Sequence, residues 1–188
     1  GGVLKMVGTR PDFTLDLDAI AAAITEKTNV MLINSPNNPT GAVYPREDLE
    51  RIARLAVGHD LFLVADEAYQ FFVYDDFVCT SLYDLENVRD RLIVTRTFSK
   101  HFAMTGFRVG YTVAPEELTA AMVRLHSHVT GNVCTFAQHG ALAALNMDDD
   151  LPIRRRVDLQ RQRDLAFDLA AGLFPCIRPR GAFYLFPD

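Results

Sequence analysis

Runs of apolar and β-branched residues alternate with amphipathic stretches along the first hundred residues. Such runs occupy residues 30–33, 61–65 and 92–95, and their length and composition are typical of strands buried on both faces. Next to them, apolar residues recur at helical spacing over residues 16–27 and 45–58. Strands that alternate with helices in this way predict an α/β fold, in which helices cover a mostly parallel sheet.

The rest of the pattern predicts two further short strands and a helical C-terminal part. Residues 1–7 and 107–113 have the length and composition of strands. Beyond them the apolar spacing is helical, and we expect three helices, at residues 116–128, 136–147 and 152–173. We therefore divide the chain into a large domain, residues 1–150, and a linking helix with the start of a smaller α+β domain, residues 151–188.

Three polar clusters follow directly on predicted strands, at residues 34–41, 66–69 and 97–100. In open parallel sheets, ligands bind beyond the carboxyl ends of the strands. We therefore expect the three clusters to converge at one edge of the sheet. This convergence indicates a functional site more strongly than any single motif does.

Lys100 and Arg108 indicate what such a site would bind. Lys100 stands among apolar and small residues, and burial lowers the pKa of a lysine, so its amine is a candidate nucleophile for a carbonyl group. Alternation along the predicted strand 107–113 places Arg108 on one face with Gly110 and Thr112, where its charge needs an anion such as phosphate. One ligand that carries both a carbonyl group and a phosphate is pyridoxal 5′-phosphate (PLP).

The other polar residues of the clusters suit the same ligand. Asp66 beside a pyridine ring would keep the ring nitrogen protonated, so that the ring withdraws electrons from the α-carbon of an amino acid. The Tyr69 hydroxyl and the Asn38 amide can reach the phenolic oxygen of PLP. The phosphate can be held by Thr97, Ser99 and Arg108. Lys100 would then bind the cofactor and move the substrate proton as general acid and base.

Each of these residues also has a purely structural interpretation. An Asp-Glu pair after a strand commonly caps a helix. Asn-Pro-Thr-Gly commonly forms a turn, and a tyrosine such as Tyr69 commonly belongs to the core. The order, the spacing and the strand-end positions of the clusters nevertheless agree with one site, which favours the functional interpretation.

Composition narrows the class of protein. The chain has 188 residues, 49% hydrophobic and 23% charged, which is typical of a globular protein with one domain, or one domain and part of another. A net charge of -5 without a basic block argues against nucleic acid or an anionic membrane as a partner. Three widely spaced cysteines indicate neither a disulfide framework nor a zinc site, which favours a cytoplasmic location. No apolar run approaches the roughly 18 residues of a membrane span.

Residues 34–41, 66–69 and 99–111 together resemble the class I/II aminotransferases, which are fold-type I PLP enzymes, and the match looks closest to the prokaryotic aspartate and aromatic branch. Residues 181–184, Gly-Ala-Phe-Tyr, are similar to a segment of the small domain of these enzymes. The resemblance covers nearly the whole chain. It implies a PLP-dependent transfer of an amino group from an α-amino acid to a 2-oxo acid, in a homodimer.

The resemblance also implies a role for each site residue. Lys100 is the Schiff-base lysine, Asp66 the pyridinium partner, and Tyr69 and Asn38 the contacts of the phenolate. The implied phosphate ligands are Thr97, Ser99 and Arg108. The family's other phosphate-binding loop, its ring-stacking aromatic residue and its substrate-carboxylate arginine have no counterpart here. We therefore expect a fragment of a longer protein, with little transaminase activity alone and with an apolar sheet face left uncovered.

Three alternatives remain open. A PLP-dependent lyase or decarboxylase on the same fold would share every residue discussed. A non-catalytic aminotransferase-like binding domain would also keep Lys100, but would follow a basic DNA-binding segment, which the chain lacks. A Ser-Lys hydrolase is the weakest alternative, because the adjacent side chains of Ser99 and Lys100 diverge on an extended segment.

Overall fold

A four-stranded sheet forms the centre of the computed structural model, which describes residues 2–147 and 150–187. Its strands lie in the order β1 (Val30–Asn34), β2 (Phe62–Asp66), β3 (Leu92–Thr97) and β4 (Gly110–Val113). The first three are parallel, whereas β4 runs antiparallel to β3. The predicted α/β fold with a mostly parallel sheet is confirmed, and the antiparallel strand makes the sheet mixed.

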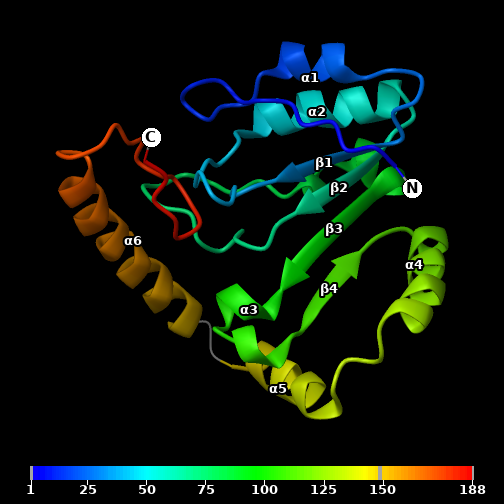
Figure 1. Cartoon of the computed structure of the whole chain (residues 1–188). Helices are drawn as coiled ribbons and strands as arrows, with labels where there is room; N and C mark the ends of the chain where they lie inside the picture. Colours follow the sequence, from blue (N-terminus) through cyan, green and yellow to red (C-terminus); the bar gives the residue numbers. More distant parts are fainter. Residues whose placement is uncertain (1, 148–149, 188) are drawn as a thin grey trace.

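Two helices cover one face of the sheet, α1 (Leu17–Ala23) and α2 (Arg46–Gly58) (Figure 1). The predicted inner face of α2 is buried against the strands, and it consists of Leu49, Ile52, Ala53 and Ala56. Burying a leucine or isoleucine side chain stabilises the fold by about 1.5–3 kcal/mol. The core of the molecule therefore lies between α2 and the sheet.

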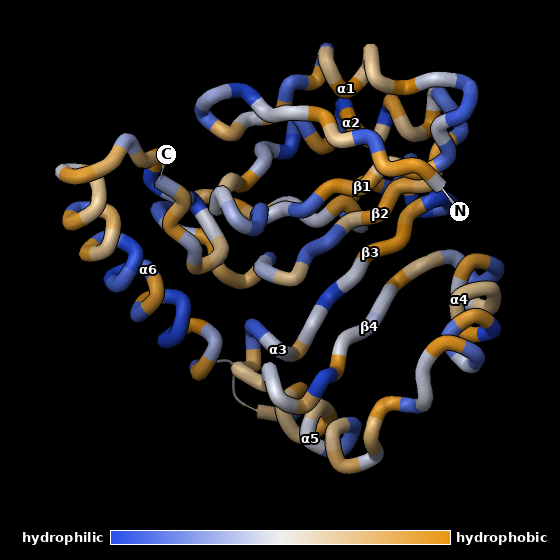
Figure 2. Tube along the Cα trace, in the orientation of Figure 1, coloured by the Kyte–Doolittle hydropathy of each residue, from blue (hydrophilic) through white to orange (hydrophobic). Residues whose placement is uncertain are grey.

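The opposite face of the sheet remains partly open. Alternate side chains of β1 and β2 point away from the core, and Val30, Leu32 and Phe62 are 53%, 63% and 41% exposed. Figure 2 shows hydrophobic residues along β1, β2 and β3. The expectation of an apolar face without a cover agrees with this exposure.

The C-terminal half is helical, as predicted. A short helix, α3 (Phe98–His101), follows β3 directly, and the later helices are α4 (Glu116–Val129), α5 (Thr135–Leu145) and α6 (Asp150–Ala170). Three short 3-10 helices, Leu82–Asp84, Glu86–Arg91 and Thr105–Phe107, lie in the segments between the strands. In Figure 1, α4 and α6 lie at opposite sides of the molecule. Among the described residues, no helix is long and apolar enough to cross a membrane.

A buried arginine connects α6 to the rest of the chain. The Arg163 guanidinium donates to both carboxylate oxygens of Asp75, at 2.6 and 2.7 Å, and to the carbonyl oxygen of Pro179, at 2.7 Å. A bidentate pair of this kind combines charge with fixed geometry. Arg163 therefore joins α6, the loop after β2 and the C-terminal segment.

Three predicted elements differ from the structure. Residues 2–7 form no strand and are mostly exposed, and Gly1 lies outside the described residues. The first helix ends at Ala23 rather than at residue 27, because Thr25 and Thr28 hydrogen-bond to each other in a separate turn. The predicted strand 107–113 begins only at Gly110.

The late start of β4 changes the position of Arg108. Thr105–Phe107 is a turn of 3-10 helix, and Arg108 itself has a left-handed backbone with φ 54°. The left-handed conformation interrupts the alternation of a strand. The prediction that Arg108 shares a strand face with Gly110 and Thr112 is therefore wrong.

Candidate active site

The three polar clusters meet at the carboxyl ends of β1, β2 and β3, as predicted. Asn34 pairs with Asp66 across β1 and β2, and Asp66 pairs with Thr95 across β2 and β3. The Asn34 side-chain amide donates to the carbonyl oxygen of Asp66 at 3.1 Å, and the backbone N–H of Glu67 donates to the carbonyl oxygen of Thr95 at 3.0 Å. Parallel pairing thus places the ends of all three strands at one edge.

Two aromatic rings flank the amine of Lys100. The Lys100 Nζ lies 5.6 Å from the centre of the Tyr69 ring and 5.5 Å from the centre of the Phe183 ring. The two rings meet edge to face, with their centres 5.2 Å apart. Among the described residues, no carboxylate forms an ion pair with Lys100. The amine therefore lies beside apolar ring faces and is not neutralised by an acidic side chain.

The Tyr69 hydroxyl has polar neighbours from two distant parts of the chain. It hydrogen-bonds to the Tyr184 hydroxyl, and the Asn38 side chain is a second polar neighbour. Burial raises the pKa of Tyr69, the Tyr184 hydroxyl and the Asp66 charge raise it further, and Asn38 acts in the opposite direction. The phenol is therefore protonated at neutral pH and can donate a hydrogen bond.

Asp66 and Asn38 are both fixed by local hydrogen bonds. The Asp66 carboxylate accepts from the backbone N–H of Ala68 at 3.1 Å, as a residue that starts a turn does. The backbone N–H of Asn38 donates to the Asn34 side-chain oxygen at 2.7 Å. The structure thus gives Asp66 a structural role at the strand end and also places its charge near Tyr69.

The predicted phosphate ligands come together only in part. The Thr97 hydroxyl caps α3 by accepting from the backbone N–H of Ser99 at 3.0 Å, and Ser99 is buried. The exposed Arg108 guanidinium donates to the carbonyl oxygen of Thr105 at 3.0 Å. In the part of the chain that the structure describes, no hydrogen bond joins Arg108 to Thr97 or Ser99. Thr97 and Ser99 lie together at the start of α3, whereas Arg108 hydrogen-bonds to Thr105.

The C-terminal segment contributes two site residues that sequence reasoning missed, Phe183 and Tyr184. Backbone N–H groups of Arg180 and Gly181 donate to the carbonyl oxygen of Gly41, at 3.0 and 2.9 Å. A Gly-Ala pair followed by two aromatic residues was a weak signal of such a docked segment. The resemblance singled out residues 181–184, but it gave Phe183 and Tyr184 no role.

Gly181→Ala should detach this segment. A Cβ at position 181 would lie 2.8 Å from Pro36 Cβ, 2.8 Å from Val43 Cγ2 and 2.9 Å from the carbonyl oxygen of Phe72. We expect a loss of about 1–3 kcal/mol in the free energy of unfolding, measured by urea denaturation. The control is Gly172→Ala, where a Cβ would meet nothing within 4 Å. Equal stability of the two variants would contradict the close packing described.

Glu67 connects the ends of β2 and β3. It is 4% exposed, and its carboxylate accepts from the Arg96 guanidinium at 2.8 and 3.1 Å and from the Ser81 hydroxyl at 2.7 Å. It also accepts from the backbone N–H of Leu82 at 3.0 Å. The sequence interpretation gave Glu67 no role beyond that of a helix cap together with Asp66, because nothing local reveals a partner 29 residues away.

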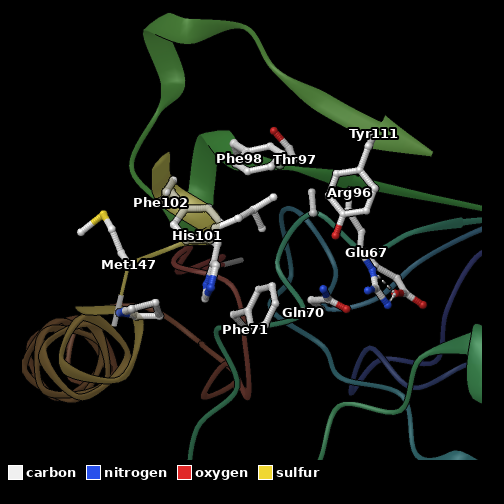
Figure 3. Close-up of a pocket in the computed structure, with 14 residues that line it drawn as sticks. Glu67, Gln70, Phe71, Arg96, Thr97, Phe98, His101, Phe102, Tyr111 and Met147 are labelled. Atoms are coloured by element: carbon white, nitrogen blue, oxygen red, sulfur yellow. Dashed lines mark hydrogen bonds and ion pairs between the residues drawn. The ribbon is translucent and has the colours of Figure 1, made fainter. Parts of the chain in front are cut away.

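A cavity of about 230 Å³ lies beside these strand ends. Figure 3 shows the Glu67–Arg96 pair at one side of it and Phe71 and His101 at the other. The rings of Phe71 and His101 stack with their centres 3.5 Å apart. Of the predicted site residues, Thr97 is in its lining, whereas Lys100, Tyr69 and Asp66 are not. The cavity therefore adjoins the Lys100 site and shares Thr97 with it.

Comparisons with known proteins agree with this geometry. The profile of a family described as "Aminotransferase class I and II" matches residues 2–188. A probable aspartate/prephenate aminotransferase of Aquifex aeolicus is 40% identical over 100% of this chain and 50% of its own length. An aspartate aminotransferase of Pyrococcus abyssi is 38% identical over 94% of this chain and 46% of its own length.

Solved structures of aminotransferases also match this chain. The aromatic aminotransferase from Pyrococcus horikoshii superposes with a TM-score of 0.89 at 38% identity, over 94% of this chain and 48% of its own length. The chain thus spans about half the length of the relatives that it matches. Sequence and fold agree over nearly all of the chain, and the resemblance inferred from the three polar clusters is confirmed. This chain belongs to the class I and II aminotransferase family.

Proposed function

We propose that the chain is the cofactor-binding part of a PLP-dependent aminotransferase, which transfers an amino group from an α-amino acid to a 2-oxo acid. The observation that carries the proposal is the position of the Lys100 amine. It lies beside the rings of both Tyr69 and Phe183 at the strand ends, without an acidic partner among the described residues. An amine in such surroundings is suited to react with a carbonyl group.

The residues present fit PLP by their chemistry. Lys100 offers an amine for the aldehyde, Asp66 a carboxylate for the pyridine nitrogen, and Tyr69 and Asn38 donors for the ring oxygen. Donors for the phosphate are Thr97, Ser99 and Arg108. Arg108 forms no ion pair within the described residues, so that its charge is available to an anion.

When bound, PLP supplies an electron sink for the negative charge that develops at the α-carbon of the substrate. Lys100 would take the α-proton at its Nζ and return it as general acid and base. Asp66 would hold a proton at the pyridine nitrogen, and the Tyr69 hydroxyl would donate to the ring oxygen. Phe183, whose ring centre lies 5.5 Å from the amine, would limit the access of water from that side.

The substrate class follows from the relatives. Those compared above are named as aspartate/prephenate, aspartate and aromatic aminotransferases, so we propose acidic and aromatic amino acids as donors. We further propose that the protein forms a homodimer and is cytoplasmic. We also propose that this chain divides into a large domain, residues 1–150, and a linking helix with the start of a smaller domain, residues 151–188. Because the chain spans about half of these relatives, we expect slow turnover by the chain alone.

The reaction type is tested by analysing products in a single turnover. The chain is mixed with one equivalent of PLP and excess aspartate or phenylalanine, and the products are separated by mass. We expect equal amounts of pyridoxamine 5′-phosphate and the matching 2-oxo acid. Carbon dioxide or free ammonia in place of these products would assign the chain to the decarboxylase or lyase alternative.

Arg108→Gln should weaken the binding of PLP without affecting pyridoxal, which lacks the phosphate. A hydrogen bond to a charged group contributes about 1.5–3 kcal/mol, so we expect the dissociation constant of PLP to rise roughly 10- to 100-fold. Fluorescence titration with both ligands measures the difference. Arg124→Gln, on the exposed surface of α4, is the control. An equal loss of affinity for PLP and pyridoxal would argue against a phosphate contact.

A further inference from the structure

Tyr184 lies at the site although no role has been assigned to it. It comes from the C-terminal segment, 115 residues after Tyr69, and the two tyrosines hydrogen-bond through their hydroxyls. Their rings also meet edge to face, with centres 5.5 Å apart. In Figure 1 the C-terminal segment, in red, lies at the end of the sheet where β1 and β2 finish.

The hydrogen-bonding capacity of a phenol limits what this pair can do. A tyrosine hydroxyl has one proton to donate and can accept from other donors. The Asn38 side chain acts to lower the pKa of Tyr69, and its amide group is able to donate to the Tyr69 oxygen. The proton between the two tyrosines can belong to either of them. If Tyr69 supplies it, Tyr69 has no proton left for a ligand.

A ligand with an anionic oxygen beside Tyr69 determines which of the two tyrosines donates to the other. An anionic oxygen beside Tyr69 needs a donor, and a hydrogen bond to a charged partner is roughly twice as strong as one between neutral groups. Tyr69 can supply that donor only when Tyr184 donates to the Tyr69 oxygen. Hydrogen bonds in such a chain also polarise and strengthen one another.

We propose that Tyr184 is a positioning residue that donates to Tyr69 and thereby directs the Tyr69 proton toward the anionic ring oxygen of PLP. The inference rests on the proposed function, because it needs a ligand with such an oxygen. Tyr184 acts through Tyr69 and has no direct contact with the ligand. The Tyr184 hydroxyl therefore affects the binding of PLP only while Tyr69 has its own hydroxyl.

Tyr184→Phe tests the inference because it keeps the ring and removes the hydroxyl. We expect the dissociation constant of PLP to rise about three- to tenfold, since part of one hydrogen bond is lost. The pH at which the visible absorption of the bound cofactor changes should rise too, because a weaker donor favours the protonated form. The control is Tyr83→Phe, at an exposed tyrosine away from the site.

A double-mutant cycle separates this role from a purely structural one. In a Tyr69→Phe background, Tyr184→Phe should change neither PLP affinity nor the absorption titration further. Additive effects of the two substitutions would overturn the inference, and so would a Tyr184→Phe chain that behaves like the wild type. If the wild-type chain retained no PLP, the proposed function would fail together with the inference. Wild-type binding with an unchanged Tyr184→Phe variant would overturn the inference alone.

Discussion

Lys100→Ala should abolish covalent capture of PLP by the chain. Borohydride reduction fixes PLP to the amine that holds it, and mass spectrometry of peptides then identifies this amine. The chain has three lysines, Lys5, Lys27 and Lys100. Lys5 and Lys27 are exposed and belong to none of the three polar clusters, whereas Lys100 lies beside the rings of Tyr69 and Phe183. We expect the label at Lys100 in the wild type and no specific label in Lys100→Ala.

Lys27→Ala is the matched control, because it removes an exposed lysine and leaves the site intact. This variant should capture PLP to the same extent as the wild type. A label of equal yield on all three lysines would indicate unspecific reaction of PLP with surface amines. Retention of a stoichiometric label in Lys100→Ala would show that another amine holds the cofactor.

Glu67→Ala should cause the largest loss of stability among single substitutions near the site. It leaves the partly buried Arg96 guanidinium without its carboxylate and deprives the Ser81 hydroxyl and the Leu82 N–H of their acceptor. Breaking a buried ion pair by removing one partner costs about 3–5 kcal/mol, and we expect about 3 kcal/mol because Arg96 is 25% exposed. Urea denaturation measures the change in the free energy of unfolding.

Two further variants test this explanation. Glu47→Ala removes an exposed carboxylate of α2 and should change stability by no more than about 0.5 kcal/mol. Glu67→Ala combined with Arg96→Met removes both charges and should recover part of the loss, because no uncompensated charge is left. A double variant that is less stable than the sum of its single variants would contradict the ion-pair explanation.

The sheet and its main helices could be predicted because their signals are local. The runs at residues 30–33, 61–65 and 92–95 are continuous and too short for helices, and α2 has apolar residues at regular helical spacing. The start of β4 could not be predicted this way. Residues 107–113 alternate as a strand does, but the left-handed backbone of Arg108 depends on the preceding 3-10 turn.

The same distinction applies to the candidate site. Lys100, Asp66, Tyr69 and Asn38 were predicted because each follows a strand, and parallel pairing places the ends of such strands together. Phe183 and Tyr184 reach the site through backbone hydrogen bonds to Gly41, and these contacts join segments about 140 residues apart. No period or local motif encodes such a contact. The partners of Glu67 were missed for the same reason.

The central claim is that residues of this chain hold PLP through Lys100. The most direct test is the visible absorption of the wild-type chain after addition of PLP and exhaustive dialysis, with circular dichroism to verify that the protein is folded. We predict a retained band equivalent to one PLP per chain, which shifts toward the pyridoxamine form when aspartate is added. A folded chain that loses all PLP on dialysis would contradict the claim.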